Sequence, residues 1–192
     1  MRAAPQHTQP RMQPKRLAAV GIVVLIAGCS LLGWSTADAS AAQDRSATVC
    51  AALLTQLDNS IPASPEDEAG IDSLPVLNTQ GIDVVGRLQS ADGALDVPVA
   101  AKGADVRITP ALNEGRTGEL VVEGCSYQSG IGSIDSMKRG SSLTFTQMDG
   151  TIRTYRVADT GTLQGEFNDN FDLLVYYCDT CGAKHWAGCE SA

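Results

Sequence analysis

Glu119-Leu-Val-Val-Glu-Gly-Cys125 is a short apolar run that ends in a cysteine, and Phe171-Asp-Leu-Leu-Val-Tyr-Tyr-Cys178 is a second run with the same ending. Their length and their content of Val, Leu and Tyr are typical of β-strands. Thiols at two strand ends can form a disulfide, or one of them can act as a nucleophile. We therefore expect the chemistry of this chain at the ends of these two strands.

The residues around these runs also favour a β-fold. Further β-rich segments begin near residues 82, 94, 142 and 151. Asp149-Gly150 provides a hairpin turn between the last two, because glycine readily adopts the positive φ that such turns need. Short strands at regular spacing predict a closed barrel or a sandwich. We assign residues 75–192 to this all-β domain.

Residues 35–74 precede the β-domain, and we expect them to form a stalk that contains one amphipathic helix. Val49, Leu53, Leu54 and Leu57 fall on one helical face, and Pro62 ends the pattern. The spacing predicts a helix over about residues 46–58.

The N-terminus has the pattern of a membrane-targeting segment. Residues 1–16 include Arg and Lys but no acid, and residues 17–34 are almost wholly apolar. Basic residues on the N-terminal side predict that the rest of the chain lies outside the cytoplasm. Three fates stay open: lipid attachment at Cys29 of the lipobox-like Ile26-Ala-Gly-Cys29, an uncleaved anchor, or cleavage near Ala37-Asp-Ala39 that releases the protein. The first two tether the protein to the outer face of the membrane.

The exported part of the chain is strongly acidic. All 22 acidic residues follow residue 37, where only ten of the 14 basic residues lie, so this part has a formal charge of −12. Such a surface repels phosphate backbones, and we expect no nucleic-acid partner. Export also favours disulfides among the cysteines that follow the membrane segment. They are odd in number, so at least one thiol is left over or pairs between molecules: Cys50, Cys125, Cys178, Cys181 and Cys189.

Several motifs in the expected β-domain resemble those of sortases, the cysteine transpeptidases of Gram-positive cell surfaces. Val85-Gly-Arg-Leu88 with Leu95-Asp-Val-Pro-Val99 is similar to the opening pattern of that family, and Met137-Lys-Arg-Gly140 is similar to a later turn. Leu120 to Tyr127 resembles the segment that carries the catalytic His of sortases, and Asp172 to Cys178 resembles the segment that carries the nucleophile. The resemblance covers roughly residues 82–192 and implies a sortase-like closed β-barrel.

The resemblance also implies roles for single residues. Cys178 stands at the position of the nucleophile, and Cys125 stands where the family has its catalytic His. The family's Arg is absent, and only Lys184 and His185 lie near its place. The implied activity is transpeptidation between a peptide sorting motif and an amine acceptor, without a cofactor, at the surface of a Gram-positive cell. We expect this chemistry to be impaired, because Lys is a point charge and lacks the two-pronged donation of Arg.

A disulfide between Cys125 and Cys178 is the alternative that the resemblance suggests. It would block the nucleophile and leave a non-catalytic sortase-like module that binds peptides or pilins. Pairing of Cys181 with Cys189 is a companion hypothesis. The spacing Cys178-x2-Cys181-x3-His185-x3-Cys189 also supplies four ligands of the type that zinc prefers. Exported thiols oxidise more readily than they bind zinc, and we expect no metal.

Overall fold

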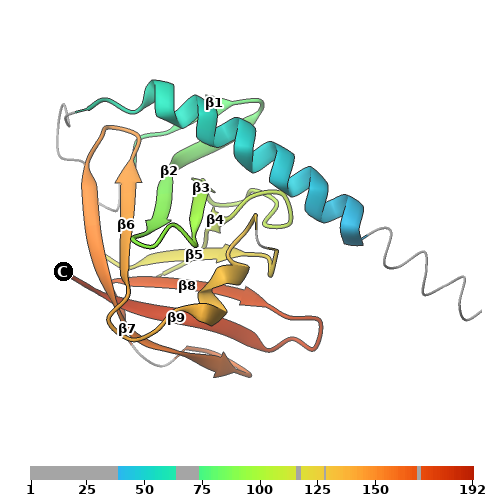
Figure 1. Cartoon of the computed structure of the whole chain (residues 1–192), viewed down its shortest axis with the longest axis vertical. Coiled ribbons are helices and arrows are strands. Elements are labelled where there is room, and N and C mark those ends of the chain that lie inside the picture. The colour runs from blue at the N-terminus through green and yellow to red at the C-terminus, as the bar shows by residue number, and fades with distance from the viewer. Residues whose placement is uncertain (1–38, 64–73, 116–117, 128, 168–169) are drawn as a thin grey trace, which may run out of the picture. The chain divides into compact units, whose positions relative to one another are not determined.

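The computed structural model describes residues 39–63, 74–115, 118–127, 129–167 and 170–192. Within these ranges the chain forms nine strands in one sheet, in the spatial order β1-β2-β3-β4-β5-β8-β9-β7-β6 (Figure 1). The strands are β1 (Leu77–Thr79), β2 (Ile82–Ser90), β3 (Asp96–Ala100), β4 (Ala111–Leu112), β5 (Leu120–Gly124), β6 (Ser142–Gln147), β7 (Ile152–Leu163), β8 (Leu173–Cys178) and β9 (Lys184–Ser191).

A pairing between β2 and β6 closes this sheet into a barrel. Residues from Gly86 to Ser90 of β2 lie antiparallel to β6, and the short β1 pairs only with the first residues of β2. The other eight strands therefore form a closed barrel, as the spacing of the β-rich segments predicts. Closure leaves no long unpaired edge.

Side chains alternate between the two faces of each strand, and the apolar side chains on the inner face fill the barrel. Leu88, Val122, Phe145 and Val175 come from four different strands, and all are 0% exposed in one continuous core. Burying each such side chain stabilises the fold by about 1.5–3 kcal/mol. Gly188 on β9 leaves room for Phe171, whose ring carbons lie within 2.5 Å of the position that a Cβ at residue 188 would take.

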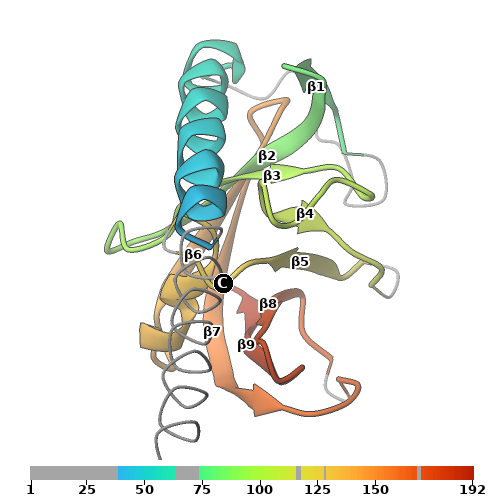
Figure 2. The same cartoon turned by 90° about the vertical axis from the view of Figure 1, so that its right-hand side faces the viewer.

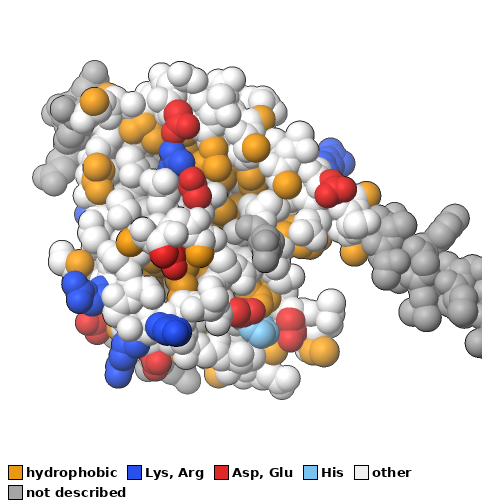
Figure 3. Space-filling view, viewed as in Figure 1, with side chains coloured by type: hydrophobic (Ala, Val, Ile, Leu, Met, Phe, Trp, Pro, Cys, Tyr) orange, Lys and Arg blue, Asp and Glu red, His pale blue; other side chains and the backbone are white. Residues whose placement is uncertain are grey.

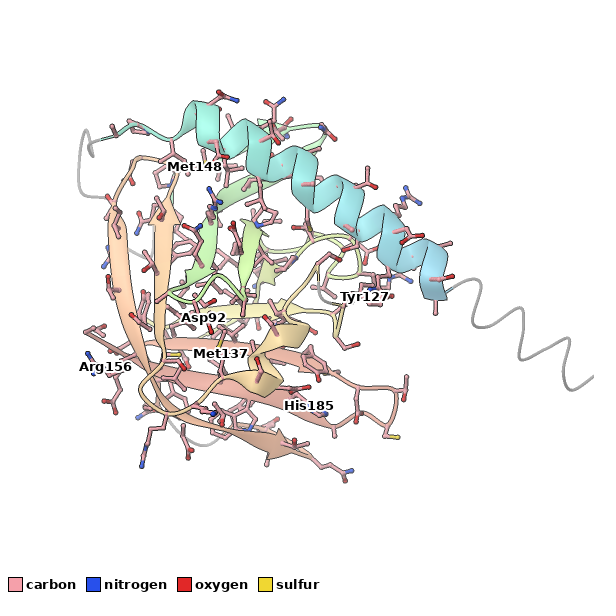
Figure 4. All side chains as sticks on the ribbon, in the orientation of Figure 1. Asp92, Tyr127, Met137, Met148, Arg156 and His185 are labelled. Atoms are coloured by element: carbon pink, nitrogen blue, oxygen red, sulfur yellow. The ribbon has the colours of Figure 1, made fainter. Side chains whose placement is uncertain are left out.

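One helix covers residues 39–60 of the described part, and from residue 42 onward it lies along the side of the barrel (Figure 2). Leu53 and Leu57 pack against Val84 of β2 and against Met148, which lies at the β6–β7 turn beneath the helix (Figure 4). The hydroxyl of Ser46 donates to the carbonyl of Ile108 at 2.9 Å. The helix is longer than the predicted 46–58, and it packs on the barrel where we expected a stalk.

The predicted membrane segment at residues 17–34, with Cys29, lies outside the described residues. Among the residues that are described, no helix combines the length and the apolar character that a bilayer crossing requires.

Candidate active site

The parallel pairing of β5 with β8 brings the two cysteine-bearing strand ends together. Gly124 of β5 and Tyr177 of β8 are Cα partners, so Cys125 follows the last pair on one strand and Cys178 on the other. Val122 and Val175 point into the barrel core, whereas Val121, Leu174 and Tyr176 form a separate cluster. Because side chains alternate along a strand, both cysteines belong to the outer face with that second cluster.

Lys184 lies on the same outer face, directly across from the expected nucleophile. Cys178 and Lys184 are Cα partners in the antiparallel β8–β9 pair. Side chains of such partners project to the same face, with Cβ atoms about 4.5–5.5 Å apart. The Lys184 ammonium lies 4.9 Å from the Phe167 ring centroid and 5.6 Å from the Tyr176 ring centroid. These cation–π contacts hold the charge over the Phe167 and Tyr176 rings, on the face to which Cys178 belongs.

His185 lies on the opposite face from Cys178. It pairs with Tyr177, and the two rings stack with centroids 4.7 Å apart and an interplanar angle of 7°. His185 Nδ1 lies 3.0 Å from Asp135 Oδ1 on the short 3-10 helix η2 (Gly132–Ser136), and Nε2 lies 3.6 Å from Asp179 Oδ2. The imidazole is visible between acidic side chains in Figure 3, and His185 is labelled beside η2 in Figure 4. Of the two predicted substitutes for Arg, the structure brings only Lys184 to the nucleophile's face.

An open groove lies on the outer face of β5 and β8, the face to which Cys178 belongs. Its volume is about 270 Å³, and its lining combines apolar and aromatic side chains with acidic ones and one lysine: Val121, Phe167, Leu174, Tyr176, Glu114, Glu119, Glu166 and Lys184. A slightly larger cavity of about 310 Å³ lies between the β1–β2 turn and the loop from Ala101 to Thr109. The groove on β5 and β8 is the candidate substrate site, because its lining includes Lys184, the cross-strand partner of Cys178, and Tyr176 on the same face.

The fold is similar to that of solved sortases. Sortase A from Corynebacterium diphtheriae is similar to this chain with a TM-score of 0.50, at 10% sequence identity, over 76% of this chain and 83% of that one. The chain has the sortase fold. Two further similar structures are a Clostridium perfringens sortase C solved with the C-terminal cell wall sorting motif (15% identity, 57% and 71% covered, TM-score 0.48) and sortase C1 from Streptococcus agalactiae (10%, 79% and 90%, TM-score 0.48). No protein-family model and no curated protein sequence matches the chain.

Cys125 gives this sortase-fold site an unusual acid–base environment. Burial first, and then the negative charge of Asp105, raises the pKa of the Cys125 thiol, although the positive charge of Arg107 opposes them. A thiol with a raised pKa keeps its proton at neutral pH. Cys125 therefore cannot take over the acid–base cycling that an imidazole performs near pH 7.

A hydrogen-bonded group on the outer face of the sortase-fold barrel was not predicted from the sequence. Asn113 Nδ2 donates to Glu123 Oε2 at 2.6 Å and to the Tyr176 hydroxyl at 2.7 Å, and that hydroxyl donates to Glu123 at 3.0 Å. Burial first, and then the Glu123 carboxylate, raises the pKa of Tyr176. The group fixes the Tyr176 ring against which Lys184 packs. Alternation along β8 could have placed Tyr176 on the face of Cys178, but the partners come from other strands.

All five cysteines in the described residues are free thiols in this structure. The expected Cys125–Cys178 bridge is therefore not formed here, although the two residues follow paired positions. The geometry does not fit a Cys181–Cys189 bridge. Cys189 is 0% exposed in the core beside Leu173 at the start of β8, whereas Cys181 is exposed in the turn beyond the end of β8.

The zinc arrangement is not formed either. Across the described ranges, no three His, Cys, Asp or Glu side chains converge where they could hold a metal. Cys189 lies inside the barrel, and His185 faces Asp135, so the four residues of the spacing do not meet.

Proposed function

We propose that this chain is a sortase-like cysteine transpeptidase with weakened chemistry. The observation that carries the proposal is the placement of Cys178. It is exposed at the end of β8, on the face of the groove, with Lys184 as its cross-strand partner. One similar structure is a sortase C with a sorting motif, and a peptide segment of that kind is the ligand we propose for the groove.

In the proposed reaction, the Cys178 sulfur attacks a backbone carbonyl of the peptide and forms a thioester. The amide bond breaks, and the leaving amine takes up a proton. An acceptor amine then attacks the thioester, which forms a new amide and restores the thiol. Lys184 donates to the carbonyl oxygen as negative charge develops on it. The chain's only histidines are His7 and His185, and His185 faces Asp135, so we expect slow proton transfer to the leaving amine.

Peptides that carry a thiol-reactive ketone in place of the scissile carbonyl test this proposal. A panel with different sorting-type sequences should label Cys178 on the reduced protein, as read by peptide mass mapping. Cys178→Ser should abolish labelling, and Cys181→Ser is the matched control for an exposed thiol three residues away. If labelling depends on neither peptide sequence nor Cys178, the proposal fails.

Substitutions that should increase activity test the roles proposed for positions 125 and 184, the general acid and the oxyanion donor. Cys125→His supplies an imidazole on the outer face, and Lys184→Arg supplies a planar double donor opposite the nucleophile. A positioned general acid typically contributes about 10²–10⁴-fold in rate. We therefore expect the double variant to catalyse transpeptidation at least about 10-fold faster than the parent protein. Equal rates for the double variant and the parent would contradict the assigned positions.

A second proposal is a non-catalytic peptide-binding module in which Cys125 and Cys178 are bonded. The register of β5 and β8 favours it, because Gly124 and Tyr177 are paired just before the two cysteines. A loop of about 50 residues closed by a disulfide would stabilise the fold by roughly 4 kcal/mol. Non-reducing peptide mapping of protein from its native compartment distinguishes the two. A complete Cys125–Cys178 link that survives mild reduction would support the module.

We further propose that residues 17–34 tether the domain to the outer face of the cell membrane. The basic residues before this segment and the acidic, cysteine-containing domain after it support this orientation. Membrane fractionation of wild type and Cys29→Ala, with mass analysis of the N-terminal peptide, separates lipid attachment from an uncleaved anchor. Recovery of wild type in the medium alone would contradict both.

A further inference from the structure

Two exposed thiols lie within one tight turn at the candidate active site. Cys178 is the last residue of β8, and Cys181 lies in the turn that leads to β9. Both are exposed, whereas Cys50 and Cys189 are buried. Cys181 is not a partner for Cys189, because Cys181 lies in the turn before β9 and Cys189 lies five residues beyond the first residue of that strand, inside the core. Cys181 is instead close in sequence and in space to Cys178.

Backbone hydrogen bonds reverse the chain directly after Cys178. The N–H of Asp179 donates to the carbonyl of Ala183 at 2.8 Å, and the N–H of Gly182 donates to the carbonyl of Asp179 at 3.1 Å. The Asp179 carboxylate accepts the N–H groups of Cys181 and Ala183, each at 2.8 Å. Gly182 has a φ of 80°, which the closing position of such a turn requires.

This turn limits how far apart the two thiols can be. Three residues span at most about 10 Å in an extended chain, and the reversal at Asp179 shortens that span. A disulfide needs a Cα–Cα distance of about 4.4–6.8 Å. Because both side chains are at the surface and neither packs in a core cluster, a small adjustment of the turn can bring the sulfurs together without a cost in core packing.

We propose that Cys178 and Cys181 form a reversible dithiol–disulfide pair that reacts with small disulfides and masks the nucleophile. The Cys178 thiolate attacks one sulfur of the small disulfide, which gives a mixed disulfide and releases one thiol. The Cys181 thiolate then attacks the Cys178 sulfur, which closes the Cys178–Cys181 bond and releases the second thiol. The two protein thiols are oxidised, the small disulfide is reduced, and the released thiolates take up the two protons.

Cys181 thus acts as the thiol that clears adducts from Cys178. A reactive thiol outside the cytoplasm meets oxidants constantly, and an adduct on a nucleophile with no nearby second thiol would persist. The masking effect on transpeptidation rests on the proposed function, whereas the redox pair itself does not. Cys125 is the competing partner for Cys178, so the test removes it first.

Glutathione disulfide is the probe, with the full chain in detergent. Cys125→Ser keeps the proposed pair, and Cys125→Ser with Cys181→Ser is the matched control. After acid quenching and alkylation, non-reducing peptide mapping should find Cys178 linked to Cys181 in the single variant. The glutathione adduct at Cys178 should be at least tenfold more abundant in the double variant. Equal amounts of adduct in both variants would overturn the proposal, as would Cys125–Cys178 as the sole link in oxidised wild type.

The peptide probe separates this result from the proposed function. Peptide labelling of Cys178 that is lost on oxidation and regained on reduction supports both proposals. Reversible pairing with no peptide labelling of the reduced protein leaves the redox pair standing and removes the transpeptidase. Peptide labelling that is insensitive to oxidation removes the redox pair and leaves the transpeptidase.

Discussion

Gly132→Ala tests whether the loop that carries Cys125 is held as tightly as the structure indicates. Gly132 begins η2 and lies against the segment that follows β5. A Cβ on this residue would lie 2.1 Å from the carbonyl oxygen of Ser126 and 3.0 Å from that of Tyr127. Carbon and oxygen atoms normally approach to about 3.3 Å, so the loop would have to move by about 1 Å.

That movement breaks two hydrogen bonds at the base of the loop. The N–H of Gly132 donates to the carbonyl of Tyr127 at 3.1 Å, and the N–H of Ile131 donates to that of Cys125 at 3.2 Å. Each such bond contributes about 0.5–1.5 kcal/mol, and an overpacked site costs about 1–3 kcal/mol. We therefore expect Gly132→Ala to lower the free energy of unfolding by about 2–6 kcal/mol.

Gly161→Ala on β7 is the matched control. A Cβ there would first meet the Trp186 ring, at 3.3 Å, and alanine is favoured over glycine within a strand by about 0.5–1 kcal/mol. Urea unfolding of protein that begins at residue 39, followed by circular dichroism, should leave Gly161→Ala within about 1 kcal/mol of the parent. Gly132→Ala should also speed alkylation of Cys125. A loss for Gly132→Ala no greater than that for Gly161→Ala would refute the packing that we describe for this loop.

Three further predictions concern stability. Leu53→Ala, in the helix, should lower the free energy of unfolding in urea by about 2–5 kcal/mol, because the Leu53 side chain is 0% exposed. Leu54 is only partly buried, so Leu54→Ala should cost clearly less, and equal costs would contradict docking of the helix. Burial raises the pKa of Cys189 from its ordinary 9.0 to about 12. Between these two values the folded state keeps a proton that the unfolded chain releases, so the free energy of unfolding should fall as pH rises from 9 towards 12. Cys189→Ala should flatten that decline in unfolding measured between pH 8 and 10.5, and an unchanged slope would contradict burial of the thiol. The N–H of Ser191 donates to the Asp172 carboxylate at 2.7 Å and holds the pKa of that carboxyl below its ordinary 3.8. The carboxylate therefore stabilises the folded state above pH 3.8, and this stabilisation is lost as pH falls through the folded pKa. Asp172→Asn should therefore reduce the loss of stability on acidification from pH 5 to pH 2.5, and a steeper loss would contradict the bond.

Most of the fold could be predicted from the β-rich runs in the sequence. The runs that end at Cys125 and Cys178 are β5 and β8, and the closed barrel is confirmed. The helix was predicted too short at its start because periodicity appears only where apolar side chains meet the barrel. Residues 39–45 are small or polar, so they show no apolar stripe although they are helical.

The candidate site was less predictable because it depends on register. Lys184 and His185 are neighbours in sequence, and only the pairing of β8 with β9 puts one beside Cys178 and the other beside Tyr177. The contacts of Tyr176 on β8 with Asn113 and with Glu123 on β5 join segments that are more than 50 residues apart in sequence. Cys181 and Cys189 are close in sequence, but the extended strand from residue 184 to residue 189 between them spans about 17 Å.

The residues that build this barrel and the residues that would perform its chemistry are almost separate sets. Cys125, Cys178 and Lys184 lie at strand ends on the outer face, and none belongs to a buried cluster. A substitution at such a position changes the groups that meet a substrate and removes no core contact, so it costs the fold little. A barrel of this kind can therefore carry a cysteine or a histidine at position 125 while its strands stay in place. Measurements of stability on the reduced protein will not distinguish an active chain from an inactive one, and the reactivity of Cys178 towards peptides and disulfides will.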